Sequence, residues 1–462
     1  MSHPTSSSVI LASTLFVATL TTAPARAEHG RWVPEGPVRH HAVCSAPEQE
    51  AVMRCHAHVV VDADGRPLLS GPTGPVAGYS PSQLASAYGM PPKPAFVGGL
   101  IPVIAVVDAY DYPKAASDLA AYRAKFGLPP LAACPNSDVV AGGPAGAVPC
   151  FSKLNQVGSS TSLPAPDTTG WSQEAALDIE MASAMCPRCT IILVEANSAA
   201  DSDLGAAVNT AAAFANAISN SYGGAERSTT AFAAYYDHPG VAITASAGDT
   251  AYAGGAVEFP ASYTHVIAVG GTTLTPSSSA RGWNETVWRT SGSEATVSGC
   301  SSLYAAPAGQ RSALPVATGC ERRVVADLAA VADPATGVAV YGPASICAPS
   351  KSRPGAPSCN PAANPSGWMV FGGTSVAAPL VAGIYAVGFG IRGVAVTDPV
   401  GNLYSQYANG RAAFNDVTLG SDGNSARPSC GNPAANTFFL CNAGPGFDAP
   451  SGLGSPNGYT AL

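Results

Sequence analysis

One serine stands where a Gly-rich turn passes into an apolar stretch, in the string FGGTSVAAP at residues 371–379. The apolar residues that follow, 376–387, predict a helix that begins close to Ser375. A serine there lies beside free backbone N–H groups and the positive end of the helix dipole, which favour a nucleophile and a developing oxyanion. A serine that only caps a helix has the same pattern. Ser375 is therefore a candidate nucleophile that needs a partner base.

The usual base for such a serine is histidine, and histidine is scarce in most of this chain. Only His238 and His265 follow residue 58. His238 lies in the turn sequence DHPG and His265 precedes a short apolar run, so we interpret both as surface residues. A hydrolase with a Ser-His-Asp triad is therefore disfavoured.

Two acids four residues apart, Glu174 and Asp178, offer a different base. On a helix such residues lie on the same face, where two carboxylates repel each other unless they share a proton through a hydrogen bond. The pair then titrates jointly, and its ionised member can accept the proton of a serine. Two solvated acids on a helix surface have the same spacing, but the apolar neighbours Trp171, Leu177 and Ile179 predict at least partial burial.

A third acid, Asp249, ends the string ASAGD, directly after the apolar residues 241–243. If those residues form a parallel strand, Asp249 lies at its carboxyl end, where open α/β sheets place their sites. A protonated carboxyl there can donate a hydrogen bond to an oxyanion, although an ordinary strand-ending turn explains the motif equally. This chemistry needs the pKa of Asp249 raised by burial, and the pKa of Glu174 held lower by a hydrogen bond from Asp178.

The C-terminal region offers oxygen ligands. Asp416-Val417 and the string GPGFD at residues 444–448 place two carboxylates around Gly-rich backbone. Carboxylate and carbonyl oxygens are the ligands that Ca²⁺ prefers, and a calcium ion needs six or more of them. Ordinary Gly/Asp turns have the same composition, so this string is only a candidate metal site.

The secondary structure around these residues is indicated by apolar runs that alternate with Ala-rich stretches. Apolar runs occur at 103–107, 191–194, 241–243 and 267–269, and helical composition at 113–126 and 203–217. The alternation predicts an α/β fold with a mostly parallel β-sheet and helices on both faces. Asp108 and Asp111 follow the first of these strands, close to the expected cleft. Residues 291–366 are loop-rich and predict disulfide-bonded insertions.

Twelve cysteines form six neighbouring pairs along the chain, which indicates disulfides made in an oxidising compartment. The pairs are Cys44/Cys55, Cys134/Cys150, Cys186/Cys189, Cys300/Cys320, Cys347/Cys359 and Cys430/Cys441. Cys186 and Cys189 also have the spacing of half a zinc site or a redox pair. No second close Cys or His pair lies nearby, so a small structural disulfide is preferred.

The N-terminus agrees with an oxidising compartment. The apolar run Val9–Leu20 is followed by ARA at residues 25–27, which is the pattern of a secretory signal peptide and its cleavage site. We therefore expect a signal peptide at 1–27, a short polar leader or arm with little core of its own at 28–77, and a folded domain at 78–462. The expected location is secreted or extracellular.

Composition narrows the partners. Charged residues make up only 11% of the chain, the net charge is −8, and no Lys/Arg cluster occurs, so nucleic acid is not an expected partner. No later stretch suits a membrane span, and we expect a monomer. Few ionisable groups also suit a protein that is exposed to acid.

Taken together and in order, these motifs resemble the sedolisins, the serine-carboxyl peptidases with a subtilisin-like fold. The resemblance covers about Tyr79 to the C-terminus. It rests on EAALD at 174–178, SAGD ending at Asp249, FPASYTHVIAVGGT from Phe259, GGTS ending at Ser375, DV at 416–417 and GPGFD at 444–448. Agreement of several motifs in one order is specific, whereas each motif alone is weak.

The resemblance implies a role for each matching residue in a secreted endopeptidase that cleaves polypeptides at acidic pH. Ser375 resembles the nucleophile, Glu174 the general base, Asp178 its support, and Asp249 the oxyanion donor together with the Ser375 N–H. The segment that pairs with the substrate backbone as an added strand corresponds to Ser221, Tyr222, Gly223 and Gly224. The calcium ligands correspond to Asp416, Val417, Gly444, Gly446 and Asp448.

Two departures from the family pattern keep a second reading open. Sedolisins usually carry a large folded prosegment, whereas only residues 28–77 precede the peptidase domain here, which puts autocatalytic processing in doubt. The string VADL at 325–328 replaces the usual Pro-Asp-Val, which we interpret as a packing variation. The alternative is a calcium-stabilised secreted binding or surface protein that kept the fold and lost activity. The intact Glu174, Asp178, Asp249 and Ser375 argue against it.

Overall fold

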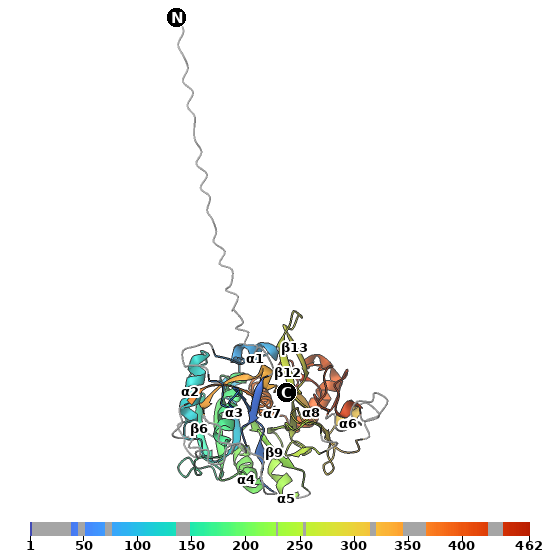
Figure 1. Cartoon of the computed structure of the whole chain (residues 1–462), viewed down its shortest axis with the longest axis horizontal. Helices are drawn as coiled ribbons and strands as arrows, with labels where there is room; N and C mark the ends of the chain where they lie inside the picture. The colour runs from blue at the N-terminus through green and yellow to red at the C-terminus, as the bar shows by residue number, and fades with distance from the viewer. Residues whose placement is uncertain are drawn as a thin grey trace. The chain divides into compact units, whose positions relative to one another are not determined.

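The computed structural model describes residues 1, 38–44, 51–69, 76–134, 148–227, 230–252, 256–314, 320–344, 366–423 and 438–462. The described residues from 38 onward form one compact unit, and every element below belongs to it (Figure 1). The predicted signal peptide lies outside the described residues, apart from Met1.

A nine-stranded sheet forms the centre of this unit. Its strand order is β13-β12-β10-β8-β4-β7-β6-β5, with β16 also paired to β12. Every pairing is parallel except that of β12 with β13, so the predicted mostly parallel α/β sheet is confirmed. The strands are β4 (Val103–Ala109), β5 (Ala132–Ala133), β6 (Cys150–Asn155), β7 (Thr190–Ala196), β8 (Ala217–Asn220), β10 (Ala242–Ser246), β12 (Ile267–Pro276), β13 (Trp283–Val287) and β16 (Leu328–Val331).

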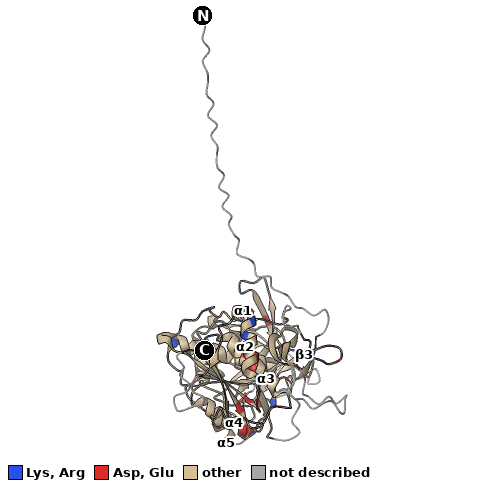
Figure 2. Cartoon of the chain, turned by 90° about the vertical axis from the view of Figure 1, so that its left-hand side faces the viewer, with Lys and Arg blue, Asp and Glu red and all other residues tan. Residues whose placement is uncertain are grey.

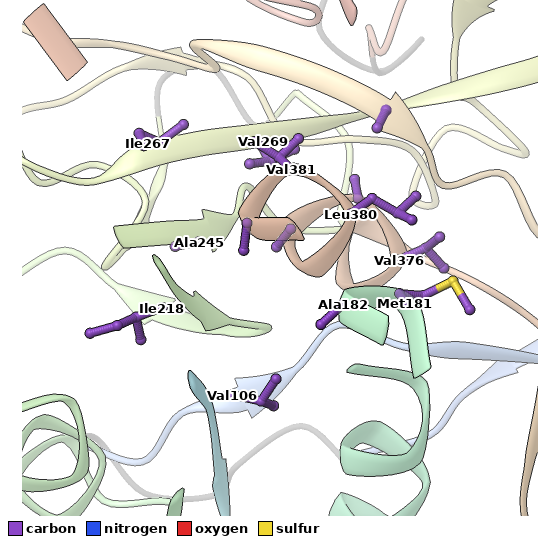
Figure 3. Packing of buried hydrophobic residues seen from close by; sticks show 14 of the residues in the cluster. Val106, Met181, Ala182, Ile218, Ala245, Ile267, Val269, Val376, Leu380 and Val381 are labelled. Atoms are coloured by element: carbon purple, nitrogen blue, oxygen red, sulfur yellow. The ribbon is translucent and has the colours of Figure 1, made fainter. Parts of the chain in front are cut away.

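Two buried helices pack together against this sheet and carry the predicted site. Every residue of α3 (Trp171–Met185) is buried, and α7 (Thr374–Arg392) is buried along most of its length. Figure 3 shows Met181 and Ala182 of α3 beside Val376 of α7, with residues of β4, β8, β10 and β12 around them. Among the described residues only α7 is long and apolar enough to cross a membrane, and 89% of its apolar window is buried, so it is the core helix of the fold.

The other helices lie around this centre. Helix α4 packs on β4 and β7, and α2 packs on α3. Their bounds are α1 (Pro81–Ala87), α2 (Ala115–Lys125), α4 (Asp201–Ala212), α5 (Thr230–Ala233), α6 (Gln310–Ala313) and α8 (Pro399–Asn409). Short 3-10 turns are Val97–Gly99, Ala234–Tyr236, Pro334–Thr336, Arg411–Ala413 and Phe438–Leu440. In the view of Figure 2, Lys and Arg occupy separate positions and form no single patch.

The N-terminal segment departs from the predicted arm. Strands β1 (Arg39–Ala42) and β3 (His58–Val61) join β18 (Ser366–Gly372) and β17 (Val338–Pro343) in a four-stranded sheet, in the order β1-β3-β18-β17. All four residues of β3 are buried. The segment therefore has a substantial share of the core, because the β-branched run VVV at residues 59–61 is long enough to pair and pack although its surroundings are polar.

A further strand of the same segment reaches the region of the predicted site. Strand β2 (Arg54–Cys55) pairs with β9 (Tyr222–Ala225), which in turn pairs with β11 (Glu258–Phe259). The remaining strands are short: β14 (Gly299–Cys300), β15 (Val324–Val325), β19 (Phe414–Asn415) and β20 (Ser455–Pro456). Asp327, in the string that departs from the family pattern, is fully buried and accepts hydrogen bonds from Tyr404 Oη and Ala268 N, which fits a packing role.

Four of the predicted disulfides are formed: Cys44–Cys55, Cys134–Cys150, Cys186–Cys189 and Cys300–Cys320. The Cys186/Cys189 pair is therefore a disulfide, as preferred over a metal or redox site. Cys347, Cys359 and Cys430 lie outside the described residues.

Candidate active site

The predicted nucleophile lies at the start of α7. Strand β18 ends at Gly372, and Gly373, with φ at 93°, turns the chain so that Ser375 is the second residue of the helix. Pro379 stands four residues further along and has no N–H to bond the Ser375 carbonyl. The Ser221 hydroxyl donates to that carbonyl instead, at 3.3 Å. The first turn of α7 is thus hydrogen-bonded to Ser221, the residue just before β9.

The predicted base is buried on the facing helix. Glu174 and Asp178 lie one turn apart on α3 and are both fully buried. Burial, and then the nearby Asp108 carboxyl at the end of β4, raise the pKa of Glu174 well above its usual range, although the Ser375 hydroxyl and the Ala57 amide oppose the rise. Burial raises the pKa of Asp178 too, followed by the charges of Asp108 and Glu174.

One detail of this pair was predicted wrongly. Among the described residues, Glu174 and Asp178 make no hydrogen bond to each other. Glu174 Oε2 instead accepts the Ala57 N–H at 3.0 Å. Asp108 joins them as a third buried carboxyl, so its position near the cleft belongs to the site, whereas Asp111 forms an ion pair with Lys153.

Asp249 lies three residues beyond β10 and is tied to the start of α7. Its Oδ1 accepts the Thr374 N–H at 2.9 Å and the Thr374 hydroxyl at 2.7 Å. Because Thr374 precedes Ser375, these bonds place the carboxyl beside the nucleophile. His58 Nε2 lies 3.3 Å from Asp249 Oδ2. The four predicted catalytic residues are therefore brought together in one place.

The pKa values of Asp249 and Glu174 shift in the directions opposite to those predicted. Burial opposes ionisation of Asp249, but the His58 imidazole, the His56 charge and the Thr374 amide together lower the pKa of this carboxyl below its usual value. Glu174 has a raised pKa instead. The prediction did not include His58, which lies beside Asp249 and lowers the pKa of this carboxyl.

The N-terminal segment passes directly across these groups. The His56 N–H lies 3.2 Å from the Ser221 carbonyl oxygen and 3.1 Å from Ser375 Oγ. A Cβ on Gly373 would lie 1.9 Å from the His56 carbonyl oxygen and 2.8 Å from Asp249 Oδ2, so only glycine leaves room for that carbonyl beside Asp249. The His56–Ala57 peptide bond thus lies between Ser375, Asp249 and Glu174, and it covers all three.

The strand predicted to pair with substrate, β9, is already paired with β2 of the N-terminal segment. On β9, Tyr222 pairs with Cys55 and Gly223 with Arg54, both antiparallel. The sequence argument missed the residues that make this arrangement, His56 and His58 of the segment and their partners Ser246 and Glu258. The available signal was the clustering of five of the eight histidines between residues 28 and 77.

The predicted calcium ligands also lie together. Asp416 accepts the Gly446 N–H at 3.0 Å, and the buried Asp448 accepts the N–H groups of Gly444 and Ser451, each at 2.9 Å. Burial raises the pKa of Asp448 to about 7, and the negative charge of Asp416 contributes to the rise. Two carboxylates held close by glycine backbone are a donor set that fits a hard divalent cation.

Stability should be highest in acid, because five buried carboxyls in and behind the site share a pKa raised by burial. They are Asp108, Glu174, Asp178, Glu180 and Glu195, the last with a pKa of about 8. Below about pH 4 they are protonated in both folded and unfolded chains. As pH rises the unfolded chain ionises first, so the free energy of unfolding falls until the folded-state pKa values are passed.

We expect the thermal midpoint to fall by at least about 5 °C between pH 4 and pH 8, since every tenfold rise in the proton affinity of a carboxyl on folding corresponds to about 1.4 kcal/mol. Glu180→Gln is the matched variant, because Glu180 is buried and only accepts the Tyr341 N–H. It should leave the midpoint at pH 4 nearly unchanged and raise it at pH 8. A wild-type midpoint that is highest near neutral pH contradicts the argument.

Comparison with known proteins agrees with this geometry. The subtilase family model matches residues 167–388. This range includes Glu174, Asp178, Asp249 and Ser375. The chain is 29% identical over 436 residues to kumamolisin of Bacillus sp. (strain MN-32), covering 89% of this chain and 68% of that protein. Both matches point to the sedolisin family. The chain is a serine-type peptidase.

Two further similarities concern the sedolisins themselves. The chain is 28% identical over 203 residues to sedolisin of Pseudomonas sp. (strain 101), a match that spans 43% of this chain and 28% of that protein. The solved structure of a Pseudomonas sedolisin, a serine-carboxyl proteinase complexed with two molecules of pseudo-iodotyrostatin, has a TM-score of 0.61 to this chain at 23% identity. It covers 83% of this chain and 96% of that structure. This likeness confirms the subtilisin-like fold.

Proposed function

We propose that this sedolisin-family chain is a secreted endopeptidase that hydrolyses polypeptides in acid through Ser375, Glu174, Asp178 and Asp249. The observation that carries the proposal is the His56–Ala57 bond. The Ala57 nitrogen of this bond, which would leave as the amine, lies 3.0 Å from Glu174 Oε2. The backbone nitrogen of His56, the residue that would form the acyl group, lies 3.1 Å from Ser375 Oγ. A peptide bond is thus held where the nucleophile and the base both reach it.

The chemistry follows from these positions. Ser375 Oγ attacks the carbonyl carbon of the substrate bond, and its proton passes to ionised Glu174. The resulting oxyanion accepts hydrogen bonds from protonated Asp249 and the Ser375 N–H. Glu174 then gives its proton to the departing amine, which leaves an ester on Ser375. Glu174 takes a proton from the water that hydrolyses this ester, and it passes that proton to Ser375 Oγ as the ester bond breaks.

The proposal is tested by incubating a denatured, alkylated protein with the wild type and with Ser375→Ala at pH 4 and pH 8. We expect hydrolysis by the wild type alone, faster at pH 4. Hydrolysis by neither chain favours the inactive, calcium-stabilised binding protein. Equal hydrolysis by both chains rejects Ser375 as the nucleophile.

Secretion is part of the proposal. The four formed disulfides support an oxidising destination. The apolar run Val9–Leu20 and the ARA string support export by a signal peptide.

Calcium is proposed as the resident cation of Asp416, Val417, Gly444, Gly446 and Asp448, where it would hold two C-terminal loops together and take no part in hydrolysis. Removing a ligand that binds only the folded chain costs about 2.7 kcal/mol at a ligand concentration of 100 times Kd. We therefore expect excess chelator to lower the thermal midpoint by a few degrees. Asp416→Asn, at an exposed position, should reduce that effect, whereas the exposed control Asp64→Asn should retain it. An unchanged midpoint, with no calcium found by elemental analysis, rejects the site.

A further inference from the structure

The N-terminal segment is bordered by a second stretch of chain besides β9. The Met53 N–H donates to the Ala199 carbonyl at 2.8 Å, and the Ala51 carbonyl accepts the Asp201 N–H at 3.0 Å. An isolated antiparallel bridge lies between these two bonds. This part of the segment is therefore bound as an extended strand along the start of α4.

The two borders lie on opposite edges of the segment. In an extended strand the N–H and C=O of one residue point to the same edge, and those of the next residue point to the opposite edge. The His56 N–H faces the Ser221 carbonyl, just before β9, at 3.2 Å. Met53 and Ala51 are an odd number of residues away from His56, so their backbone groups point to the other edge.

The backbone register gives the length of chain that the cleft contacts. If the bond after His56 is the one that Ser375 attacks, His56 is the first residue before that bond, P1. Met53 is then P4 and Ala51 is P6. Ala51 has φ at 69°, so the segment leaves the extended conformation at this residue. An extended occupant of the cleft is therefore contacted as far as P6.

An ion pair joins the two borders at this end of the cleft. Arg227 Nη1 lies 3.4 Å from Asp201 Oδ2. Asp201 is the first residue of α4, whereas Arg227 lies two residues beyond β9. The Tyr304 hydroxyl donates to the Arg227 carbonyl at 2.9 Å, which fixes the backbone from which this arginine extends. We call the ion pair of Asp201 and Arg227 the clasp.

The clasp depends on its arginine. The Asp201 side chain is only 3% exposed, and its Oδ1 has no hydrogen-bond partner among the described residues. A buried carboxylate that loses its cation is strongly destabilised, more so than an exposed one. Without Arg227 the Asp201 carboxylate would turn toward water, and the two borders would no longer be linked.

We propose that the clasp holds polypeptide substrates by their P5 and P6 residues and marks the far end of the recognised sequence. The inference rests on the proposed peptidase function. A substrate that reaches P6 gains the hydrogen bond from the Asp201 N–H and lies between two linked borders, whereas one that ends at P4 does not. Arg227 is a positioning residue, because it acts through Asp201 and takes no part in bond cleavage.

The test uses nested peptides. A bond that the wild type cleaves in a denatured, alkylated protein is placed in acetylated synthetic peptides with four, six or eight residues before it. Values of kcat and KM are measured for the full chain as wild type, Arg227→Gln, Arg227→Lys and the control Arg311→Gln, which alters an exposed side chain on α6. The assay is run at pH 6, because burial raises the pKa of Asp201 and the clasp needs this carboxyl ionised.

One hydrogen bond contributes about 2- to 10-fold, so in the wild type and the control we expect kcat/KM to rise by up to about 10-fold from four residues to six. From six to eight it should stay nearly constant. In Arg227→Gln the rise should be at least about threefold smaller, through KM rather than kcat. Arg227→Lys keeps the cation and should retain most of the rise. These ratios do not depend on how often the N-terminal segment occupies the cleft, because all three peptides compete with the same segment.

The outcomes separate the two proposals. No rise between four and six residues in the wild type, or an unchanged rise in Arg227→Gln, overturns the clasp and leaves the peptidase function standing. An equal loss of kcat/KM for all three peptides in Arg227→Gln also overturns it, since a merely structural role has that effect. No hydrolysis by any chain rejects the peptidase function and the clasp with it. If Arg227→Gln fails to fold, the wild-type series and Arg227→Lys decide.

Discussion

Peptide hydrolysis should fall by at least about 1000-fold when Ser375 is replaced by alanine, because the variant has no oxygen to form the acyl intermediate. Residual turnover should come only from Asp249, Glu174 and substrate positioning. The fold should survive, since the hydrogen bonds that Ser375 Oγ accepts from the His56 N–H and donates to the Ser221 carbonyl, at 3.1 and 3.3 Å, are few among those of this region. The tie between Thr374 and Asp249 does not involve this hydroxyl.

The measurement is kcat/KM for a peptide substrate at acidic pH, with thermal unfolding to confirm that the variant folds. Ser312→Ala is the matched control, because Ser312 is exposed on α6 and should retain wild-type turnover. A Ser375→Ala chain that folds and keeps near-wild-type kcat/KM would show that another residue is the nucleophile.

The second large effect is on the pH profile. Hydrolysis needs Glu174 ionised and Asp249 protonated, but with residues 56–58 in the cleft the pKa of Glu174 is raised and that of Asp249 lowered. Displacing the segment should lower the pKa of Glu174 and raise that of Asp249. Water then reaches Glu174, whose pKa is raised chiefly by burial, and Asp249 loses the contact with His58 that lowers its pKa.

In the opened cleft we expect a bell-shaped profile with its maximum in acid. Above the pKa of Asp249 the oxyanion faces a negative charge, and kcat/KM should fall about 10-fold per pH unit. Asp249→Asn keeps a neutral donor at every pH, so its activity should stay within several-fold from pH 4 to pH 7, even if its peak is lower. The control Asp237→Asn alters an exposed carboxyl near His265 and should keep the wild-type profile.

This mechanism has a clear counter-result. A wild-type maximum near pH 8, or an Asp249→Asn profile that keeps the full alkaline decline, removes Asp249 from the role of proton donor. The search for a base would then return to His238 and His265.

The fold could be predicted from local sequence patterns, because its strands are continuous apolar runs. Residues 103–107 and 267–269 lie within β4 and β12, and both are buried almost throughout. The grouping of Ser375, Glu174 and Asp249 was also within reach, because each lies at the end of a strand or on a helix that the resemblance identifies.

Other features were out of reach because they depend on long-range pairing. His56 and Ser375 are 319 residues apart in the sequence, and nothing in the residues around His56 indicates a strand in the cleft. The environment of Glu174 is a second case, since its Oε2 accepts the amide of Ala57, which lies 117 residues earlier in the sequence. The lowered pKa of Asp249 likewise depends on His58, which follows the cleft strand.

The Cys44–Cys55 disulfide has a consequence for what hydrolysis of the His56–Ala57 bond would leave behind. Cys44 and Cys55 are the only cysteines before Ala57, and they are bonded to each other, so no covalent cross-link spans that bond. A nicked molecule would be two separate polypeptides held by the pairing of β2 with β9 and of β1 with β3. Its fragment would then dissociate reversibly, and dilution, rather than reduction, would free the cleft.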